Sequence, residues 1–371
     1  MAATQEALYR EIDLDLSWSE AELPERQRTK HVHRLHPYLG KFIPQLVETL
    51  LSRYFEPGGR VLDPFAGSGT TLVQALESEL DATGADVSEF NCLLMRVKTA
   101  RYNLFSLEHE LRDVLASFQE TKAPPIRLKG YIRDWYAAAA AAELHHFKRL
   151  SEGAEHADVL SVILARAARS ARRTRHFDLD FPKVPQLKPY WCHKHRRTCR
   201  PVGRATPFLK RYTLDTLGRI REFARLRARG CSADIRHGDS RVLDFGREFD
   251  GVVTSPPYPG LIDYHEQHRH AYELLGLDDR RELELGAAAH GMSRAALEAY
   301  ADGIAASLRN AVSFLRPGVP VVIVVNDRRD LYPPILERVG LKLEERLRRH
   351  VNRRTGRRAG EFFEDVLVAR C

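Results

Sequence analysis

The chain has 371 residues, of which 43% are hydrophobic, so it can bury one large core and a second, smaller one. Its formal charge of +8 favours an acidic polymer over a neutral metabolite as the partner. No apolar run approaches the roughly 18 residues of a membrane span, and the N-terminus lacks a signal-peptide pattern. Because five cysteines, an odd number, also indicate a reducing compartment, we expect a cytoplasmic protein that does not contact membranes.

The first third of the chain predicts alternating strands and helices. Its most informative stretch is V-L-D-P-F-A-G-S-G-T-T-L at residues 61–72, an apolar strand that runs into a glycine turn and a helix. In chain order, the expected elements are a helix containing Leu46 to Leu51, a strand from Val61, a helix at about 71–79, a strand at 82–86 and a helix at about 91–102.

The alternation stops between residues 106 and 230, where the sequence is rich in alanine, predominantly helical in pattern and then proline-rich. No acidic residue lies between Asp180 and Asp215, whereas nine lysines and arginines do, which predicts a nucleic-acid surface or a solvated basic face. Alternation then resumes, with strands expected at 234–237, 250–254, 319–327, 341–350 and 363–370.

The glycine turn predicts a cofactor site. Gly67 and Gly69 let the backbone approach a ligand closely at the end of a strand. A phosphate-binding P-loop needs a lysine that is absent here, and a dinucleotide fingerprint needs a third glycine where Leu72 stands. Asp63 would repel a pyrophosphate but suits the cationic amino end of S-adenosylmethionine, which is the cofactor we predict. Asp86, at the end of the next strand, is placed to hold ribose hydroxyls.

A second motif, T-S-P-P-Y at residues 254–258, comes where a fourth parallel strand is expected to end. Ligands bind outside the carboxyl ends of such strands, so both motifs should open onto one cleft. The exocyclic amine of a nucleobase is a poor nucleophile because its lone pair is delocalised into the ring. Acceptors from Ser255 and the Pro256 carbonyl would favour a nitrogen with an available lone pair, and Tyr258 would stack on a base that has left its duplex.

These residues resemble the motifs of the exocyclic-amino DNA methyltransferases. The similar segments are 61–71 for motif I, G-A-D-V-S at 84–88 for motif II, G-D-S at 238–240 for motif III, T-S-P-P-Y for motif IV and K-F-I-P at 41–44 for motif X. In this family a serine before Pro-Pro-Tyr is commonest among cytosine-N4 enzymes, whereas Asp or Asn dominates the adenine-N6 enzymes. The resemblance implies a Rossmann-like α/β sheet of the class I methyltransferases, with a mainly helical insert.

The resemblance also implies a role for each matching residue. The methyl-transfer site would consist of Ser255, Pro256, Pro257 and Tyr258. The cofactor would be held by Lys41, Phe42, Asp63, Phe65, Gly67, Gly69, Asp86, Asp239 and Ser240. The chain departs from the family in having its largest insert between motifs II and III. The DNA contacts that we predict therefore follow from charge and size, at Lys194, Arg196, Arg197, Arg200, Arg204, Arg353 and Arg354.

The function that follows is site-specific transfer of a methyl group from S-adenosylmethionine to N4 of cytosine in double-stranded DNA by base flipping. Residues 1–105 would form the cofactor-binding half, 106–230 the recognition insert and 231–371 the catalytic half. We expect such an enzyme in the cytoplasm of a bacterium or archaeon, at the nucleoid, either with a cognate restriction endonuclease as its partner or as an orphan methylase. The alternatives are an adenine-N6 DNA methyltransferase, an RNA base amino-methyltransferase, and a non-catalytic DNA-binding regulator with the same fold.

Other side chains have two interpretations. Cys192, His193, His195 and Cys199 could bind zinc with Cys231. The segment lacks a Cys-x-x-Cys pair, however, so we favour buried thiols beside a basic surface and predict no metal. Asp263 and Tyr264 could line the base pocket or simply pack. The basic segment N-R-R-T-G-R-R at 352–358 could clamp a phosphate or form an exposed hairpin.

Overall fold

A seven-stranded sheet is the centre of the computed structural model, which describes residues 12–19, 21–176, 178–179, 182–351 and 362–371. The strands are β1 (Arg60–Asp63), β2 (Asp81–Asp86), β5 (Ala233–His237), β6 (Val252–Thr254), β7 (Pro320–Val325), β8 (Lys342–His350) and β9 (Phe363–Arg370). Their order is β5-β2-β1-β6-β7-β9-β8, with β9 antiparallel to both neighbours and the other pairings parallel. The predicted α/β sheet is confirmed, and strand ends differ from the predictions by at most two residues.

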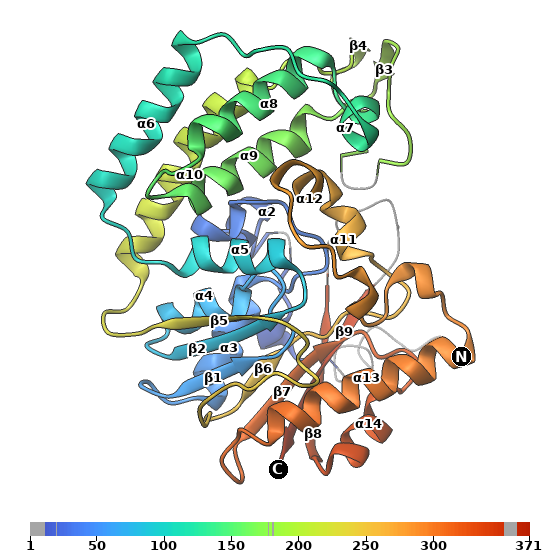
Figure 1. Ribbon diagram of the computed structural model, residues 1–371. Coiled ribbons are helices and arrows are strands. Elements are labelled where there is room, and N and C mark those ends of the chain that lie inside the picture. Colours follow the sequence, from blue (N-terminus) through green and yellow to red (C-terminus); the bar gives the residue numbers. More distant parts are fainter. Residues whose placement is uncertain (1–11, 20, 177, 180–181, 352–361) are drawn as a thin grey trace.

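Strand β7 shows why the sheet forms where it does. All six of its residues are buried, and they alternate between the two faces of the sheet. Val322 and Val324 pack in one cluster with α3 (Pro44–Tyr54) and α4 (Thr70–Glu77). Val321, Ile323 and Val325 pack in another with α13 (Arg294–Val312) and α14 (Tyr332–Val339), which lie in front of the sheet in Figure 1. The sheet is therefore covered on both faces, as its continuous β-branched run predicts.

The insert is mainly helical, as predicted, and lies above the sheet and α5 (Glu89–Thr99) in Figure 1. Its helices are α6 (Leu104–Glu120), α7 (Gly130–Trp135), α8 (Ala138–Ser151), α9 (Ala157–Ala171) and α10 (Thr206–Leu226). The sequence analysis missed one feature, a short antiparallel hairpin of β3 (Tyr190–Cys192) and β4 (Arg197–Cys199) within the proline-rich segment. Prolines flank this hairpin but are absent from its two strands, so they do not prevent the pairing.

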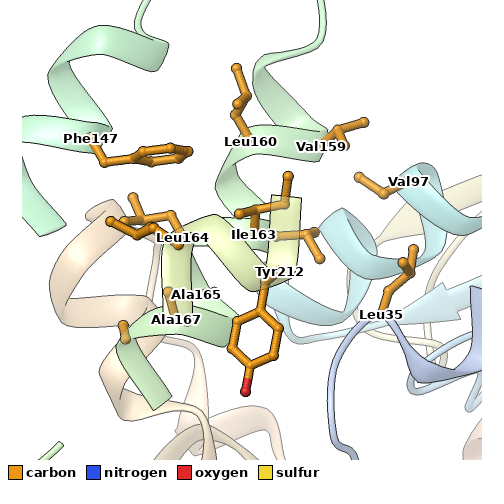
Figure 2. Close-up of a cluster of buried hydrophobic side chains, with 14 of the residues drawn as sticks. Leu35, Val97, Phe147, Val159, Leu160, Ile163, Leu164, Ala165, Ala167 and Tyr212 are labelled. Carbon is orange, nitrogen blue, oxygen red and sulfur yellow. The ribbon is translucent and has the colours of Figure 1, made fainter. Parts of the chain in front are cut away.

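The core of the insert is continuous with the helical layer on the sheet. Val159 and Ile163 of α9 belong to one cluster with Val97 of α5 and Leu35, and Figure 2 shows these side chains beside one another. The limits of the insert, which we placed at residues 106 and 230, stay a prediction. The nearest element ends are Leu104, where α6 begins, and Leu226, where α10 ends.

Shorter elements complete the described part of the chain. They are η1 (Leu14–Leu16), α2 (Glu25–Arg28), η2 (His31–Arg34), α11 (Tyr264–Gln267), α12 (Arg269–Leu275), η3 (Arg281–Leu283) and η4 (Ala288–His290). Within the described ranges, none of the helices combines the length and the apolar character needed to cross a bilayer.

Candidate active site

A cavity with about 850 Å³ of space, including the open solvent at its mouth, lies at the carboxyl ends of β1, β2, β5 and β6. Asp63 and Gly67 line it from the glycine turn, and Ser255 and Pro257 line it from the double-proline turn. The two motifs are almost 190 residues apart in the sequence but share this cavity, because parallel strands β1 and β6 are neighbours in the sheet. The expectation that both motifs open onto one cleft is therefore confirmed.

The glycine turn is fixed by steric and polar contacts. Gly67 and Gly69 have φ angles of 50° and 78°, a left-handed conformation that favours glycine. A Cβ atom at Gly67 would lie 3.0 Å from the Tyr38 hydroxyl, and one at Gly69 would lie 2.8 Å from Met95. Gly67 lines the cavity, whereas Gly69 is the N-cap of α4 and does not. Gly69 therefore fixes the conformation of the turn without lining the cavity.

Asp63 ties the two motifs together. Its side chain is 1% exposed and accepts hydrogen bonds from the hydroxyls of Thr71 and Thr254, both at 2.6 Å, and from the Phe65 backbone N–H at 3.1 Å. Burial raises the pKa of Asp63 to about 6, although these three donors oppose the rise. One carboxylate thus links β1, α4 and β6. Asp63 therefore holds the two motifs in place and also lines the cavity.

Asp86 joins the second strand to the glycine turn. Its half-buried carboxylate accepts from the backbone N–H groups of Gly67 at 3.0 Å and Ser88 at 2.8 Å. Burial raises the pKa of Asp86 to about 6. The predicted ribose-binding residue therefore lies on the cavity wall, within reach of whatever the glycine turn holds.

Asp239 and Ser240 reach the same cavity from the loop after β5. Arg241 donates to both carboxylate oxygens of Asp239, from Nε at 2.9 Å and from Nη2 at 2.6 Å. The Ser240 hydroxyl is buried and donates to the hydroxyl of Ser307 on α13 at 3.1 Å. The motif thus joins the strand end to the helical layer.

Lys41, Phe42 and Phe65, which we predicted to hold the cofactor, also line the cavity. The Lys41 ammonium donates to the His33 carbonyl at 2.8 Å, and burial lowers the pKa of Lys41 to about 8. Phe42 is buried, whereas Phe65 is half-buried, so its ring offers an apolar surface to a ligand.

The double-proline turn is held from β7 and α13. The Ser255 hydroxyl donates to the Val324 carbonyl at 2.9 Å, and the Tyr300 hydroxyl donates to the Pro257 carbonyl at 2.9 Å. Pro256 is buried, and the Tyr258 hydroxyl donates to Glu364 of β9 at 3.0 Å. Of these four predicted residues, Ser255 and Pro257 line the cavity and Pro256 and Tyr258 do not. The stacking role of Tyr258 stays a prediction.

Four further residues on the cavity wall were missed or left ambiguous by the sequence. Tyr38 stacks on Tyr264 with ring centroids 5.5 Å apart and accepts a hydrogen bond from Asn91 at 3.2 Å. Glu284 accepts from the Tyr264 backbone N–H at 3.2 Å. Tyr38 stands next to the K-F-I-P segment and could have been found there. Glu284 lies in a long loop without any motif, so no local signal pointed to it.

The charge of the cavity opposes that of the protein. Among the lining residues, Asp63, Asp86, Asp239 and Glu284 outnumber the one amine, that of Lys41, within a chain whose formal charge is +8. Arg241 pairs with Asp239 from outside the lining. Such a lining attracts a cation and repels a phosphate. A ligand with a sulfonium and an ammonium group, beside a ribose, suits these acceptors better than a pyrophosphate does.

The predicted DNA contacts lie apart from the cavity lining. Lys194, Arg196, Arg197 and Arg200 are exposed on or beside the β3–β4 hairpin, where Trp191 is also 57% exposed. Arg204 is exposed too but forms an ion pair with Glu143. Arg353 and Arg354 lie outside the described residues.

The sequence of the chain is similar to those of known methyltransferases. A family model described as DNA methylase, of the N6/N4 methyltransferases, matches residues 6–96. The chain is 35% identical to the type II methyltransferase M.MjaII of Methanocaldococcus jannaschii, over 98% of this chain and 84% of that protein. It is 26% identical to the type II methyltransferase M.MvaI of Kocuria varians, over 61% of this chain and 53% of that protein.

Solved structures are more distantly similar. TrmN from Thermus thermophilus has a TM-score of 0.35 and 15% identity, over 89% of this chain and 49% of that chain. The rRNA methyltransferase AviRa from Streptomyces viridochromogenes has a TM-score of 0.36 and 14% identity, over 90% of this chain and 88% of that chain.

Proposed function

The chain belongs to the DNA methyltransferases that modify exocyclic amino groups, and from this membership we propose that it methylates N4 of cytosine in duplex DNA. Enzymes of this family use S-adenosylmethionine, whose sulfonium supplies an electrophilic methyl group. The protein must hold the cofactor, admit a single base and align the amine with the methyl carbon.

Binding of the cofactor would rest on the acidic wall of the cavity. The turn at Gly67 and the ring of Phe65 would receive the methionine part, and Asp86 would accept hydrogen bonds from the ribose hydroxyls. Asp239 would face the adenine, with Lys41 and Phe42 closing over the site. This assignment is supported by the lining of one cavity by all of these side chains and by its excess of carboxylates.

The observation that carries the proposed methyl-transfer role of Ser255 is its hydrogen bond to β7, and the identity of the residue carries the choice of base. Because its hydroxyl hydrogen points to the Val324 carbonyl at 2.9 Å, the lone pairs of the Ser255 oxygen remain to accept from a substrate N–H. A neutral acceptor at this place would orient the exocyclic amine and leave its nitrogen lone pair for the methyl carbon. The same position carries Asp or Asn in most adenine-N6 enzymes of the family, so the serine favours cytosine.

Access of the base would require flipping, because an exocyclic amine paired within a duplex cannot enter a cavity of this kind. We propose that the insert supplies the DNA contacts for this step. Its support is the group of exposed basic residues at the β3–β4 hairpin beside the exposed ring of Trp191. The division of the chain into two catalytic parts and a recognition insert is part of the same proposal.

The test is to methylate duplex DNA with cofactor labelled in the methyl group, digest the product to nucleosides and locate the label. We expect N4-methylcytosine. Label in N6-methyladenine would contradict the base assignment and leave the family intact. Label in 5-methylcytosine would contradict the chemistry, since that reaction needs a cysteine nucleophile. Parallel reactions with RNA would show whether DNA or RNA is the substrate. Calorimetry with the cofactor alone would distinguish an enzyme from a non-catalytic regulator.

A further inference from the structure

Four side chains with metal-binding atoms meet at the β3–β4 hairpin, outside the cavity lining. They are His176, from the segment after α9, Cys192 at the end of β3, His195 in the turn and Cys199 at the end of β4. One ligand atom from each lies within 4.8 Å of the other three. Because Cys192 pairs with Arg197 and Tyr190 pairs with Cys199, both thiols lie on the same face of the hairpin, at diagonal positions of its ladder.

The spacing of these atoms matches a tetrahedral ion. Bonds of about 2.3 Å to sulfur and about 2.05 Å to nitrogen, at the tetrahedral angle, separate a sulfur from a nitrogen by about 3.6 Å. The Cys192 sulfur lies 3.4 Å from Nδ1 of His176 and 3.6 Å from Nδ1 of His195, and the Cys199 sulfur lies 3.4 Å from Nδ1 of His195. The two imidazole rings are close and tilted, with centroids 4.5 Å apart at 71°.

Hydrogen bonds among the four groups account for this arrangement less well. The Cys192 thiol has one hydrogen but faces two ring nitrogens, and Nδ1 of His195 faces two sulfurs. The Tyr190 hydroxyl also lies 2.9 Å from Nδ1 of His176, a contact that an ion at this nitrogen would replace. A central cation with two thiolates and two neutral imidazoles engages all four atoms at once, and the assembly has no net charge.

Among the described residues, the hairpin has only a small apolar cluster of its own. The buried cluster at this place consists of Tyr190, Cys192 and Cys199 alone among the described residues. Isolated two-stranded hairpins are marginally stable in water, and a hydrophobic cluster of this size adds little. An ion bound by both strands, the turn and the segment after α9 would fix the hairpin to the insert.

We propose that His176, Cys192, His195 and Cys199 bind a structural Zn²⁺ ion that holds the basic hairpin in shape. With four protein ligands the site has no open position, so its role is folding and not catalysis. The sequence analysis predicted no metal here because it considered this segment and Cys231 and did not consider His176. His176 lies earlier in the sequence, outside that segment. In addition, the Cys-x-x-His spacing of Cys192 and His195 was not recognised as that of a chelating pair.

Elemental analysis of the untagged, full-length protein tests the proposal directly. We expect about one zinc ion per chain. Replacement of zinc by Co²⁺ should give a thiolate-to-cobalt charge-transfer band and the visible bands of a tetrahedral site. These two measurements use the wild-type chain, so they do not depend on the folding of any variant. Zinc well below one ion per chain together with a cobalt spectrum without thiolate bands would overturn the proposal.

Substitutions within the cluster, each with a matched control, show which residues bind the ion. Cys192→Ser combined with Cys199→Ser should abolish zinc binding, and His195→Asn should weaken it at least tenfold in competition with a chelator. Cys231→Ser and His193→Asn are the controls, because they remove a cysteine or a histidine of the same region that does not belong to the cluster. Full zinc content in the double cysteine variant would show that the ion binds elsewhere and would contradict the assignment. Since the readout is metal content, the result is independent of methylation.

Discussion

The cavity and the β3–β4 hairpin show two different ways of fixing a functional region. The cavity is built on strand ends inside a large core, and Asp63 of β1 accepts hydrogen bonds from Thr71 of α4 and Thr254 of β6. The hairpin projects from the insert with a buried cluster of three residues. A region of the first kind needs no ligand for its shape. A region of the second kind needs an ion or a partner, and this difference makes different predictions for substitutions in the two regions.

The cavity and the hairpin also differ in the sign of their charge. The cavity concentrates four carboxylates in a protein of net positive charge, and the hairpin exposes lysines and arginines. A cationic cofactor and an anionic polymer would therefore be attracted to separate places. Substitutions at one region should leave the ligand of the other unaffected. The predictions for the cavity test how it binds its ligand, and the last prediction, at the hairpin, tests the separation.

The largest effect is expected for Ser255→Ala. Loss of a preorganised acceptor at the reacting amine should lower kcat about 10²–10³-fold, by analogy with the loss of one oxyanion-hole donor, and leave the Kd of the cofactor unchanged. Single-turnover methylation and calorimetry measure the two quantities. The control is Ser313→Ala, which removes a hydroxyl that donates to the Asn310 carbonyl at 2.7 Å at the end of α13. Equal losses in both variants would remove Ser255 from the reaction.

The next largest effect is expected for Gly67→Ala. A side chain in the left-handed conformation costs about 1–2 kcal/mol, and the new Cβ would lie 3.0 Å from the Tyr38 hydroxyl on the cavity wall. We expect cofactor affinity to fall about tenfold or more, as 1.4 kcal/mol corresponds to a factor of ten. Gly58→Ala is the control, because Gly58 has a φ of 83° and open space around it. If Gly58→Ala weakens cofactor binding as much as Gly67→Ala does, the loss of affinity comes from backbone strain and not from the contact of Gly67 with the ligand.

A third effect comes from the two carboxyl groups whose pKa burial raises to about 6. Below that pH, Asp63 and Asp86 are largely protonated and lose the charge that attracts a cation. Cofactor affinity should therefore rise between pH 5 and pH 7, by about tenfold if one of the two groups dominates. Asp86→Asn should flatten this dependence. An affinity that does not change with pH in the wild-type protein would contradict the electrostatic role of the acidic wall.

The same pKa values predict the opposite trend for stability without cofactor. The folded-state pKa of Asp63 lies above its ordinary value of 3.8, so the folded protein binds more protons than the unfolded chain between these two values. The free energy of unfolding should consequently fall as pH rises from about 4 to about 6. Thermal unfolding at several pH values, with and without cofactor, would separate this cost of burying a charged Asp63 from the gain in binding.

The two regions also differ in how far the sequence predicted them. The glycine turn and the double-proline turn are short segments whose residues restrict the backbone, so the strands before them and the cavity between them could be predicted. Glu284 could not, because its place on the wall depends on the path of a long loop. The hairpin was missed because its strands are three residues long and lie among prolines. His176 was missed because only the folded insert brings it to Cys192.

The smallest effect is expected at the hairpin surface. Arg196→Glu should weaken DNA binding about three- to tenfold and reduce the salt slope by about one unit, because each phosphate contact contributes roughly 0.9 to it. The matched control is Lys342→Glu, which reverses one exposed charge on β8, outside the insert. Both variants change the net charge equally, so a nonspecific effect of charge would lower DNA affinity to the same extent in each. A difference in salt slope between them would place a phosphate at the hairpin, and identical slopes would remove Arg196 from the DNA interface. Cofactor affinity should be unchanged in both, because the acidic cavity and the basic hairpin have no lining residue in common among the described residues.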